Sequence, residues 1–154
     1  MKIQDLIQPE DIYLDVSASE LRQALEAVAE HVARGTGLRA ESVVDCLLER
    51  EALGSTSVGD AFAIPHCKIA NLRDIKVSLA RFSSPVDFAP SGDEKVRFVF
   101  VVLSPPDQPA AHLKVLSQIA RLLKRSEVRR RLLEARDAQD VLVVLREVAQ
   151  AEGL

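Results

Sequence analysis

The longest uninterrupted apolar run of the chain is Phe98-Val99-Phe100-Val101-Val102-Leu103, which completes a segment of strand-forming residues that starts at Val96. β-branched and aromatic residues dominate it, and a continuous run of this length is typical of a strand buried on both faces of a sheet. A membrane-spanning helix needs roughly 18 or more apolar residues, so this run is too short to cross a bilayer. We therefore expect a central β-strand.

Two further strands are indicated before this run. From Lys76 to Phe82 the residues alternate between polar and apolar, as they do in a half-buried strand. The shorter segment from Ala61 to Ile64 also has strand character, and Pro65 is expected to end it. A hairpin-like excursion over residues 85–93 then connects the alternating strand to the central one.

Helical periodicity marks both ends of the chain. A first helix is expected from Ser17, where Ser17-Ala18-Ser19-Glu20 has the Ser-x-x-Glu form of a capping box, to a stop at Gly35. A second is expected from about Arg39 to Leu53. Three more follow the central strand, over residues 109–124, 126–134 and 137–149.

Helices, then strands, then helices again predict an α/β protein with a small mixed β-sheet and helices packed on both sides. A length of 154 residues, 47% of them apolar, suits a single domain spanning residues 1–154. With 28% charged residues and a net charge of −3, the composition argues against a disordered chain. Asp5 interrupts any apolar signal at the N-terminus, so the cytoplasm is the expected compartment.

The cysteine and histidine content favours neither disulfides nor a metal site. Cys46 and Cys67 are the only cysteines and are wrongly spaced for a paired zinc knuckle, so both are expected to be reduced. His31, His66 and His112 are the only histidines, and none forms the i, i+4 pair of a helical metal site. We expect no metal and no other cofactor.

His66 is the strongest candidate for chemistry. It follows the proline-ended strand in Ile64-Pro65-His66-Cys67-Lys68, where a restrained backbone can present an imidazole at the edge of the sheet. Imidazole is a good nucleophile near neutral pH, and a restrained backbone lowers the cost of aligning it for attack. A structural or merely exposed histidine is the alternative.

His112 and Arg50 are candidates to assist. His112 falls in the first turn of a predicted helix on the same face as Leu116, so it should point inward or toward a cleft, where a neutral imidazole could donate to a phosphoryl oxygen. Arg50 shares a helix face with Cys46 and calls for an anionic partner. The alternatives are a core-edge histidine bonded to backbone and an arginine that reaches solvent at a helix C-terminus.

Three blocks of sequence resemble one known family. Together they resemble the fructose/mannitol-type enzyme IIA domain of the bacterial phosphoenolpyruvate phosphotransferase system, and the resemblance covers essentially the whole chain. The start of the chain, Leu6-Ile7-Gln8-Pro9-Glu10 with Leu14-Asp15, is similar to the nitrogen-regulatory branch of that family. The three blocks are Leu47-Leu48-Glu49-Arg50-Glu51-Ala52-Leu53-Gly54-Ser55-Thr56, Ala63-Ile64-Pro65-His66-Cys67-Lys68 and Pro106-Asp107-Gln108-Pro109-Ala110-Ala111-His112-Leu113.

The resemblance implies that His66 receives a phosphoryl group from a histidine phosphocarrier protein. It also implies that His112 and Arg50 line the same site and steady the phosphoryl oxygens, with the hydroxyls of Ser55 and Thr56 as further candidate contacts. The family usually has Gly after the active histidine, where this chain has Cys67. Its side chain either alters partner docking, adds thiol sensitivity, or is inert and half-buried.

The resemblance implies a phosphotransferase component that works through a phosphohistidine. A nitrogen-type regulator with regulatory target proteins is favoured, since we expect no fused permease or sugar-phosphorylating domain. The alternative is the enzyme IIA component of a fructose/mannitol-type sugar-transport system, which passes phosphate to an enzyme IIB. A non-catalytic protein-binding module and a small metal-dependent hydrolase are further hypotheses.

A basic run over residues 121–136 is the remaining sequence feature. No aromatic residues are interleaved to stack on bases, so we expect no nucleic-acid binding, and an acidic protein is the better candidate partner. The basic residues are Arg121, Lys124, Arg125, Arg129, Arg130, Arg131 and Arg136, set against Glu127 and Glu134.

Overall fold

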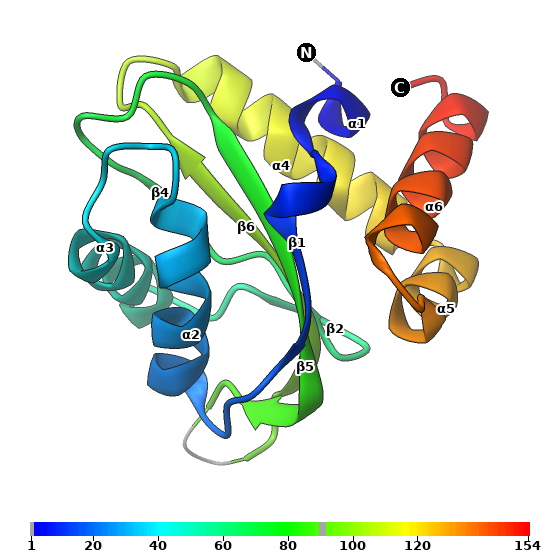
Figure 1. Ribbon diagram of the computed structural model, residues 1–154, viewed down its shortest axis with the longest axis horizontal. Coiled ribbons are helices and arrows are strands. Elements are labelled where there is room, and N and C mark those ends of the chain that lie inside the picture. The colour runs from blue at the N-terminus through cyan, green and yellow to red at the C-terminus, as the bar shows by residue number, and fades with distance from the viewer. Residues whose placement is uncertain (1, 90–91) are drawn as a thin grey trace.

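The computed structural model describes residues 2–89 and 92–154, and within them the strands form one six-stranded mixed sheet (Figure 1). The order is β1-β5-β6-β3-β2, and β4 also pairs with β6. β6 runs antiparallel to β5 and parallel to β3 and β4, while β1 is parallel to β5. The strands are β1 (Ile12–Val16), β2 (Ser57–Gly59), β3 (Phe62–Ala63), β4 (His66–Lys68), β5 (Lys76–Asp87) and β6 (Lys95–Ser104).

β6 is the central strand, as its apolar run predicts. Phe98 and Phe100 are fully buried, and the ring of Phe98 stacks on that of Phe62 at a centroid distance of 5.4 Å. Leu79 of β5 lies opposite Phe100, and Ala63 of β3 pairs with Val99. Because β6 has a bonded neighbour on each side and apolar side chains on each face, it holds the two halves of the sheet together.

Helices cover both faces of the sheet, which confirms the predicted fold class. Figure 1 shows α2 (Leu21–Ala33) and α3 (Ala40–Ala52) on one side and the other helices on the opposite side. Each layer encloses its own cluster of buried apolar residues against the sheet. The second layer contains α1 (Ile3–Leu6), the 3₁₀ turn Pro9–Asp11, α4 (Pro109–Leu123), α5 (Ser126–Glu134) and α6 (Ala138–Ala151).

The start of the first long helix differs from the prediction. α2 begins at Leu21, and its N-cap is Glu20, whose carboxylate accepts the backbone N–H groups of Arg22 and Gln23. The capping box predicted from Ser17 is therefore wrong. Glu20 replaces it because a longer acidic side chain can reach back over the same first turn. The short segments α1, β1 and β2 were not predicted, since none is long enough to show a periodic pattern.

The strand before Pro65 ends as predicted, but pairing with β6 continues beyond the proline. β3 stops at Ala63, but the Pro65 carbonyl still accepts the Val102 N–H at 2.9 Å, and pairing resumes in β4 at His66. The missing N–H of Pro65 is tolerated because Pro65 bonds to β6 through its carbonyl alone. The hairpin-like excursion is also shorter than predicted, since β5 continues to Asp87, and Pro90 and Ser91 within it lie outside the described residues.

Arg81 closes the C-terminal end of α5 from inside the molecule. The side chain is buried, and its Nη1 donates to the carbonyls of Leu132, Leu133 and Ala135 at 3.1, 3.2 and 2.7 Å. The last carbonyls of a helix have no partner within it, so these bonds satisfy acceptors that are otherwise costly to bury. A strand in the sheet thereby anchors the helix layer above it.

Replacing Arg81 by Met keeps the length of the side chain and removes its donors. We expect Arg81→Met to lower the free energy of unfolding by about 2–4 kcal/mol, because three carbonyls lose a charged donor. Arg130→Met is the matched control, since Arg130 pairs with Glu134 on the exposed surface, and its effect is expected to stay within about 0.5 kcal/mol. Urea unfolding followed by circular dichroism measures both; equal losses would contradict the capping role.

Candidate active site

His66 lies in β4 at the edge of the sheet, where the two helix layers approach each other. Residues of α3 reach it from one layer, and residues of α4 reach it from the other. They enclose a surface depression of about 370 Å³, which is ample for a phosphoryl group. Its lining includes Arg50, Leu53, His66, Lys68, His112 and Leu113.

The His66 ring is oriented by its two nitrogens. Nδ1 lies 2.7 Å from the Ile64 carbonyl oxygen, and because a carbonyl only accepts, Nδ1 carries the proton. Nε2 is left with a lone pair, which accepts the Nε–H of Arg50 at 3.3 Å. Burial lowers the pKa of His66, the Ile64 carbonyl opposes that change, and the positive charge of Arg50 lowers it further. His66 is therefore a neutral imidazole near pH 7, with Nε2 as its nucleophilic atom.

His112 places a second neutral imidazole beside the first. The ring centroids of His66 and His112 are 5.5 Å apart, and His112 is buried in the first turn of α4. Its Nδ1 lies 2.6 Å from the hydroxyl of Ser104, at the end of β6. When that hydroxyl donates to Nδ1, the ring proton is on Nε2. Burial, followed by the neighbouring His66 and Lys68, lowers the pKa of His112 to about 4.

Arg50 reaches the site from the last turn of α3. Its Nη1 donates to the Gly54 carbonyl at 2.7 Å, just beyond the end of the helix, while its Nε donates to His66. Arg50 therefore fits both alternatives predicted for it from the sequence. Its guanidinium complements a helix C-terminus, and it also lines the depression. Its planar set of donors suits the oxygens of a tetrahedral anion.

Ser55 and Thr56 are placed differently. Thr56 is buried, and both its N–H and its hydroxyl donate to the Glu51 carboxylate. The Ser55 hydroxyl accepts the N–H of Ser57 at 3.1 Å. Neither residue is among the described residues that line the depression. Their hydroxyls order the loop between α3 and β2, which includes the Gly54 carbonyl that holds Arg50.

Four residues at the site were missed by sequence reasoning. Lys68 stands two positions after His66 in β4, so the strand period would have placed both on one face, had the strand been predicted to continue. Leu53 and Leu113 are 85% and 66% exposed, and an apolar residue type does not predict such exposure. Ser104 carries no sequence signal for its bond to His112.

The two cysteines form a disulfide, so the prediction that both are reduced is wrong. Cys46 of α3 is joined to Cys67 of β4, with their Cα atoms 6.1 Å apart and 21 residues between them in sequence. Cysteine number and spacing could not show this pairing, because it depends on α3 packing against β4. Cys67 is 7% exposed, while Cys46 is half-buried and lines the depression.

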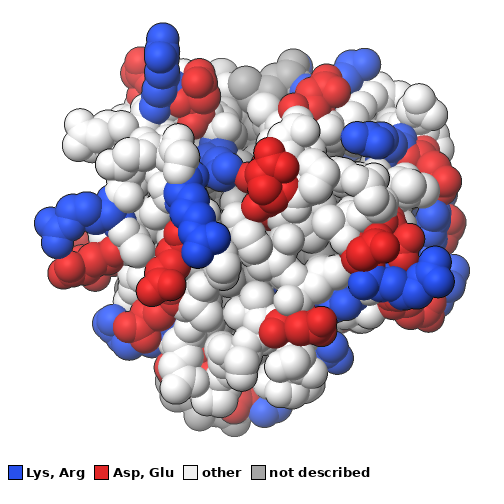
Figure 2. Space-filling view, viewed as in Figure 1, with Lys and Arg blue, Asp and Glu red and all other residues white. Residues whose placement is uncertain are grey.

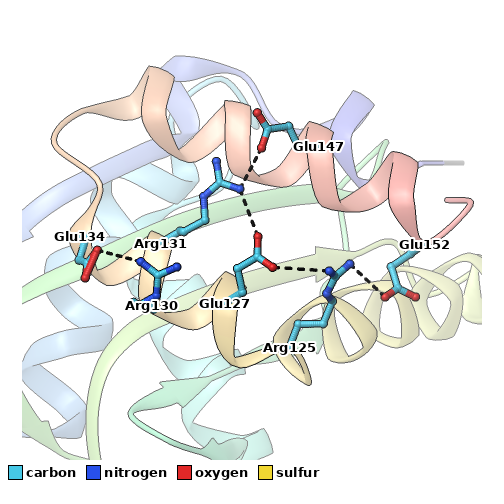
Figure 3. Close-up of polar contacts among 7 residues, drawn as sticks. All are labelled: Arg125, Glu127, Arg130, Arg131, Glu134, Glu147 and Glu152. Carbon is cyan, nitrogen blue, oxygen red and sulfur yellow. Dashed lines mark hydrogen bonds and ion pairs between the residues drawn. The ribbon is translucent and has the colours of Figure 1, made fainter.

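The basic run is largely neutralised within the molecule. Figure 3 shows Arg125 and Arg131 both bonded to Glu127, with Glu152 and Glu147 as their second partners. Arg121, Arg129, Arg130 and Arg136 also form ion pairs, with Glu152, Asp60, Glu134 and Asp140 respectively. The face in Figure 2 accordingly mixes both signs of charge rather than presenting one basic field. The run therefore acts mainly to join α5 and α6 to their surroundings.

Two kinds of feature are absent from the described part of the chain. Over residues 2–89 and 92–154, no three His, Cys, Asp or Glu side chains come together as a set of metal ligands. Across the same residues, no helix combines the length and the apolar character that crossing a bilayer requires.

Comparison with known proteins gives this chain a class and a family. The fold is an α/β sheet that brings two imidazoles and a guanidinium to one edge, and the family that the chain matches makes it a phosphotransferase component. Residues 5–148 match the family described as "Phosphoenolpyruvate-dependent sugar phosphotransferase system, EIIA 2". The chain belongs to this family.

Individual relatives include both regulatory and sugar-transport proteins. The chain is 40% identical over 145 residues to a nitrogen regulatory protein of Bradyrhizobium diazoefficiens. The aligned stretch covers 94% of this chain and 95% of that protein. It is 36% identical over 110 residues to a fructose-specific EIIA component of Haloferax volcanii, with 71% of each chain covered. The crystal structure of nitrogen regulatory protein IIA-Ntr from Neisseria meningitidis superposes with a TM-score of 0.85 at 30% identity, covering 93% of this chain and 98% of that one.

The protonation states at the site predict an NMR titration. We expect the His112 ring to remain neutral as the pH falls from 8 to 5 and to titrate near pH 4, because burial and neighbouring positive charge disfavour its charged form. His66 is expected to titrate below pH 6.5, with its proton on Nδ1 while it is neutral. Nitrogen-15 chemical shifts of the imidazoles report both; a His112 midpoint near 6.5 would show that the ring is solvated.

Proposed function

We propose that this protein is a phosphohistidine relay of the phosphotransferase system, in which Nε2 of His66 accepts a phosphoryl group from a histidine phosphocarrier protein in the cytoplasm. One observation carries the proposal. The Nε2 lone pair faces a depression whose other lining groups include the Arg50 guanidinium, the neutral His112, Lys68 and, as the one carboxylate among the described residues that line it, Glu49. Phosphoryl transfer depends mainly on positioning and on donors for the phosphoryl oxygens, and the guanidinium, imidazole and ammonium among these groups supply both.

The transfer exchanges one P–N bond for another. Nε2 of His66 attacks the phosphorus in line, the P–N bond to the carrier histidine breaks, and its electron pair returns to that carrier ring. The proton stays on Nδ1, which keeps donating to the Ile64 carbonyl, and this bond stabilises the positive charge that develops on the His66 ring. Arg50 exchanges its bond to Nε2 for bonds to the phosphoryl oxygens, and His112 donates its single N–H to one of them.

Exposed apolar side chains beside the depression support docking of a protein donor. Leu53 at the end of α3 and Leu113 in the first turn of α4 are 85% and 66% exposed, and both line the depression. Exposed apolar side chains that lie together are candidate contacts for a protein partner, because they leave water when the partner docks. The carrier's phosphohistidine can then enter the depression while this apolar rim of Leu53 and Leu113 excludes water from the transferred group.

A regulatory role is favoured over a transport role within this class. The supporting observation is the 40% identity, over nearly the full length of both chains, to a nitrogen regulatory protein. A phosphoryl group held on His66 would act as a signal to regulatory target proteins. The alternative is the enzyme IIA component of a fructose/mannitol-type transport system that passes the group to an enzyme IIB, which the similarity to a fructose-specific component supports.

Phosphorylation with labelled phosphoenolpyruvate, the first enzyme of the system and the phosphocarrier tests the chemistry. We expect one acid-labile label on the protein and none on His66→Ala, because the other imidazole that lines the depression, His112, has its Nδ1 lone pair bonded to the Ser104 hydroxyl. Arg50→Ala and His112→Ala are expected to slow labelling about 10- to 100-fold while keeping the fold, since each removes one donor to the phosphoryl group. Initial rates at limiting phosphocarrier measure these changes.

Arg39→Ala is the matched control for that experiment. Arg39 precedes the same helix as Arg50, but its side chain is exposed, and its one ion pair within the described residues is with Glu41. Its labelling rate is expected to equal that of the unmodified protein. Label that persists in His66→Ala would show that another residue is phosphorylated. Complete absence of label from the unmodified protein would leave a binding module as the function.

The apolar rim gives an independent prediction. We expect Leu53→Asp and Leu113→Asp to raise the KM for the phosphocarrier about 10-fold or more, because a charge replaces an apolar contact, with a smaller effect on the rate at saturation. Val143→Asp is the control, since Val143 is 43% exposed on α6, away from the depression. Equal KM values for all three variants would place the docking surface elsewhere.

A further inference from the structure

The disulfide joins the two elements that carry the site. Cys46 stands four residues before Arg50 on α3, so both side chains lie on one face of that helix. Cys67 directly follows His66 in β4. The bridge therefore spans the boundary across which Arg50 donates to His66. It is the same boundary at which a phosphoryl group has to be inserted.

We propose that Cys46 and Cys67 form a reversible thiol–disulfide switch whose oxidised state slows phosphoryl acceptance by His66. The inference rests on the proposed function and adds a regulatory input to it. The oxidised form holds α3 against β4, and the reduced form releases this tether. The same protein would thus respond to the thiol–disulfide balance of its compartment as well as to its phosphoryl donor.

The space at Nε2 explains why the tether matters. A phosphorus atom has to approach the attacking nitrogen to within about 3–3.5 Å, and the Arg50 Nε already occupies that position at 3.3 Å. The guanidinium must therefore retreat before attack. It is also held by the Gly54 carbonyl at the end of α3, so a retreat that keeps this bond requires the end of α3 to move away from β4. The bridge one turn earlier resists that movement.

The two sulfur atoms differ in access in a way that suits a switch. Both cysteines line the depression, but Cys46 is only half-buried while Cys67 is 7% exposed. A small disulfide from solution can reach Cys46 first, and Cys67 is close enough to resolve the mixed disulfide without rearrangement of the fold, since the two Cα atoms are 6.1 Å apart.

The oxidation balances with a low-molecular-weight disulfide such as oxidised glutathione as the oxidant. The Cys46 thiolate attacks one glutathione sulfur, forms a mixed disulfide and releases one glutathione thiolate. The Cys67 thiolate then attacks the Cys46 sulfur and releases the second. Two protein thiols are oxidised, one glutathione disulfide is reduced to two thiols, and the two protons from the cysteines pass to them. Excess reduced glutathione runs the sequence backwards.

The position of the bridge favours regulation over structural reinforcement. Disulfides in reducing compartments are usually transient, catalytic or redox-sensing, and the cytoplasm is the compartment of the proposed function. The core does not depend on the bridge, because α3 also packs through Val43, Val44 and Leu47 into the apolar cluster beneath α2 and α3. Both helix layers of the sheet bury extensive apolar clusters of their own.

The test compares phosphorylation of oxidised and reduced protein. The protein is equilibrated at a series of glutathione ratios, freed of glutathione by desalting, and mixed with phosphocarrier that has been phosphorylated beforehand, so that no other component meets the oxidant. Thiol alkylation and mass measurement give the fraction of disulfide in each sample. We expect full oxidation to slow labelling of His66 about 10-fold, because a charge-assisted hydrogen bond must break before attack and its loss has about this effect. Dithiothreitol is expected to restore the rate.

Cys46→Ser, and the variant with both cysteines replaced by serine, remove the bridge together with the thiol that glutathione reaches first. Each is expected to label at one rate whatever the glutathione ratio, and circular dichroism checks that each is folded. The switch is refuted if fully oxidised and fully reduced protein label at equal rates, if oxidised protein labels faster, or if the thiols remain free at every ratio. Reduced protein that takes no label would instead refute the proposed function, and with it this inference, even where alkylation shows that the bridge forms.

Discussion

The position of β6 is the constraint on which the rest of the structure depends. Its residues are buried on both faces, it pairs with β5 along one edge, and along the other edge it pairs with β3 and β4. Val102 fixes His66 by direct register, and Ser104 at the end of the same strand bonds to His112. One rigid strand therefore holds both imidazoles, His66 through strand pairing and His112 through the Ser104 bond, while His112 and Arg50 are themselves supplied from helix ends. A site anchored on such an element holds its geometry better than one built on loops.

The electrostatics of the site follow from where β4 lies. At the edge of the sheet, between two helix layers, His66 is buried enough for its pKa to fall below the ordinary value and open enough for a partner to reach it. Arg50 and Lys68 add positive charge, which disfavours protonation of the imidazoles and attracts an anionic phosphoryl group. One arrangement thus keeps the nucleophile neutral and draws in the group that it attacks.

Sequence patterns predicted the large elements well and the local connections poorly. The apolar run from Phe98 to Leu103 identified the central strand, and the bounds of α5 were predicted as residues 126–134. The Ser17 capping box was wrong because Glu20 caps the helix instead, and the return of strand pairing after Pro65 was missed because it depends on the bond from Val102 to the Pro65 carbonyl. These outcomes depend on three-dimensional neighbours, which a linear pattern does not contain.

For the candidate site, too, the sequence predicted some features correctly and others not. His66, His112 and Arg50 were selected as chemically capable residues at the ends of elements, and the fold brings them together around one depression. Ser55 and Thr56 were predicted from the family resemblance as hydroxyls in the loop before the strand of His66, but their hydroxyls bond within that loop and to Glu51. The disulfide shows the limit most clearly. Cys46 and Cys67 are unremarkable in spacing, and only the packing of α3 on β4 reveals that they meet.

The charge balance around His66 explains how a phosphoryl group there could serve as a signal. The depression is lined by two cationic side chains, Arg50 and Lys68, and by the carboxylate of Glu49, so its local charge is slightly positive. A phosphoryl group brings about two negative charges, which reverses that sign. The exposed Leu53 and Leu113 beside it do not change, so the same apolar rim would present an opposite charge at its centre. Partners that dock on the rim are then distinguished by charge alone, without a change in the fold.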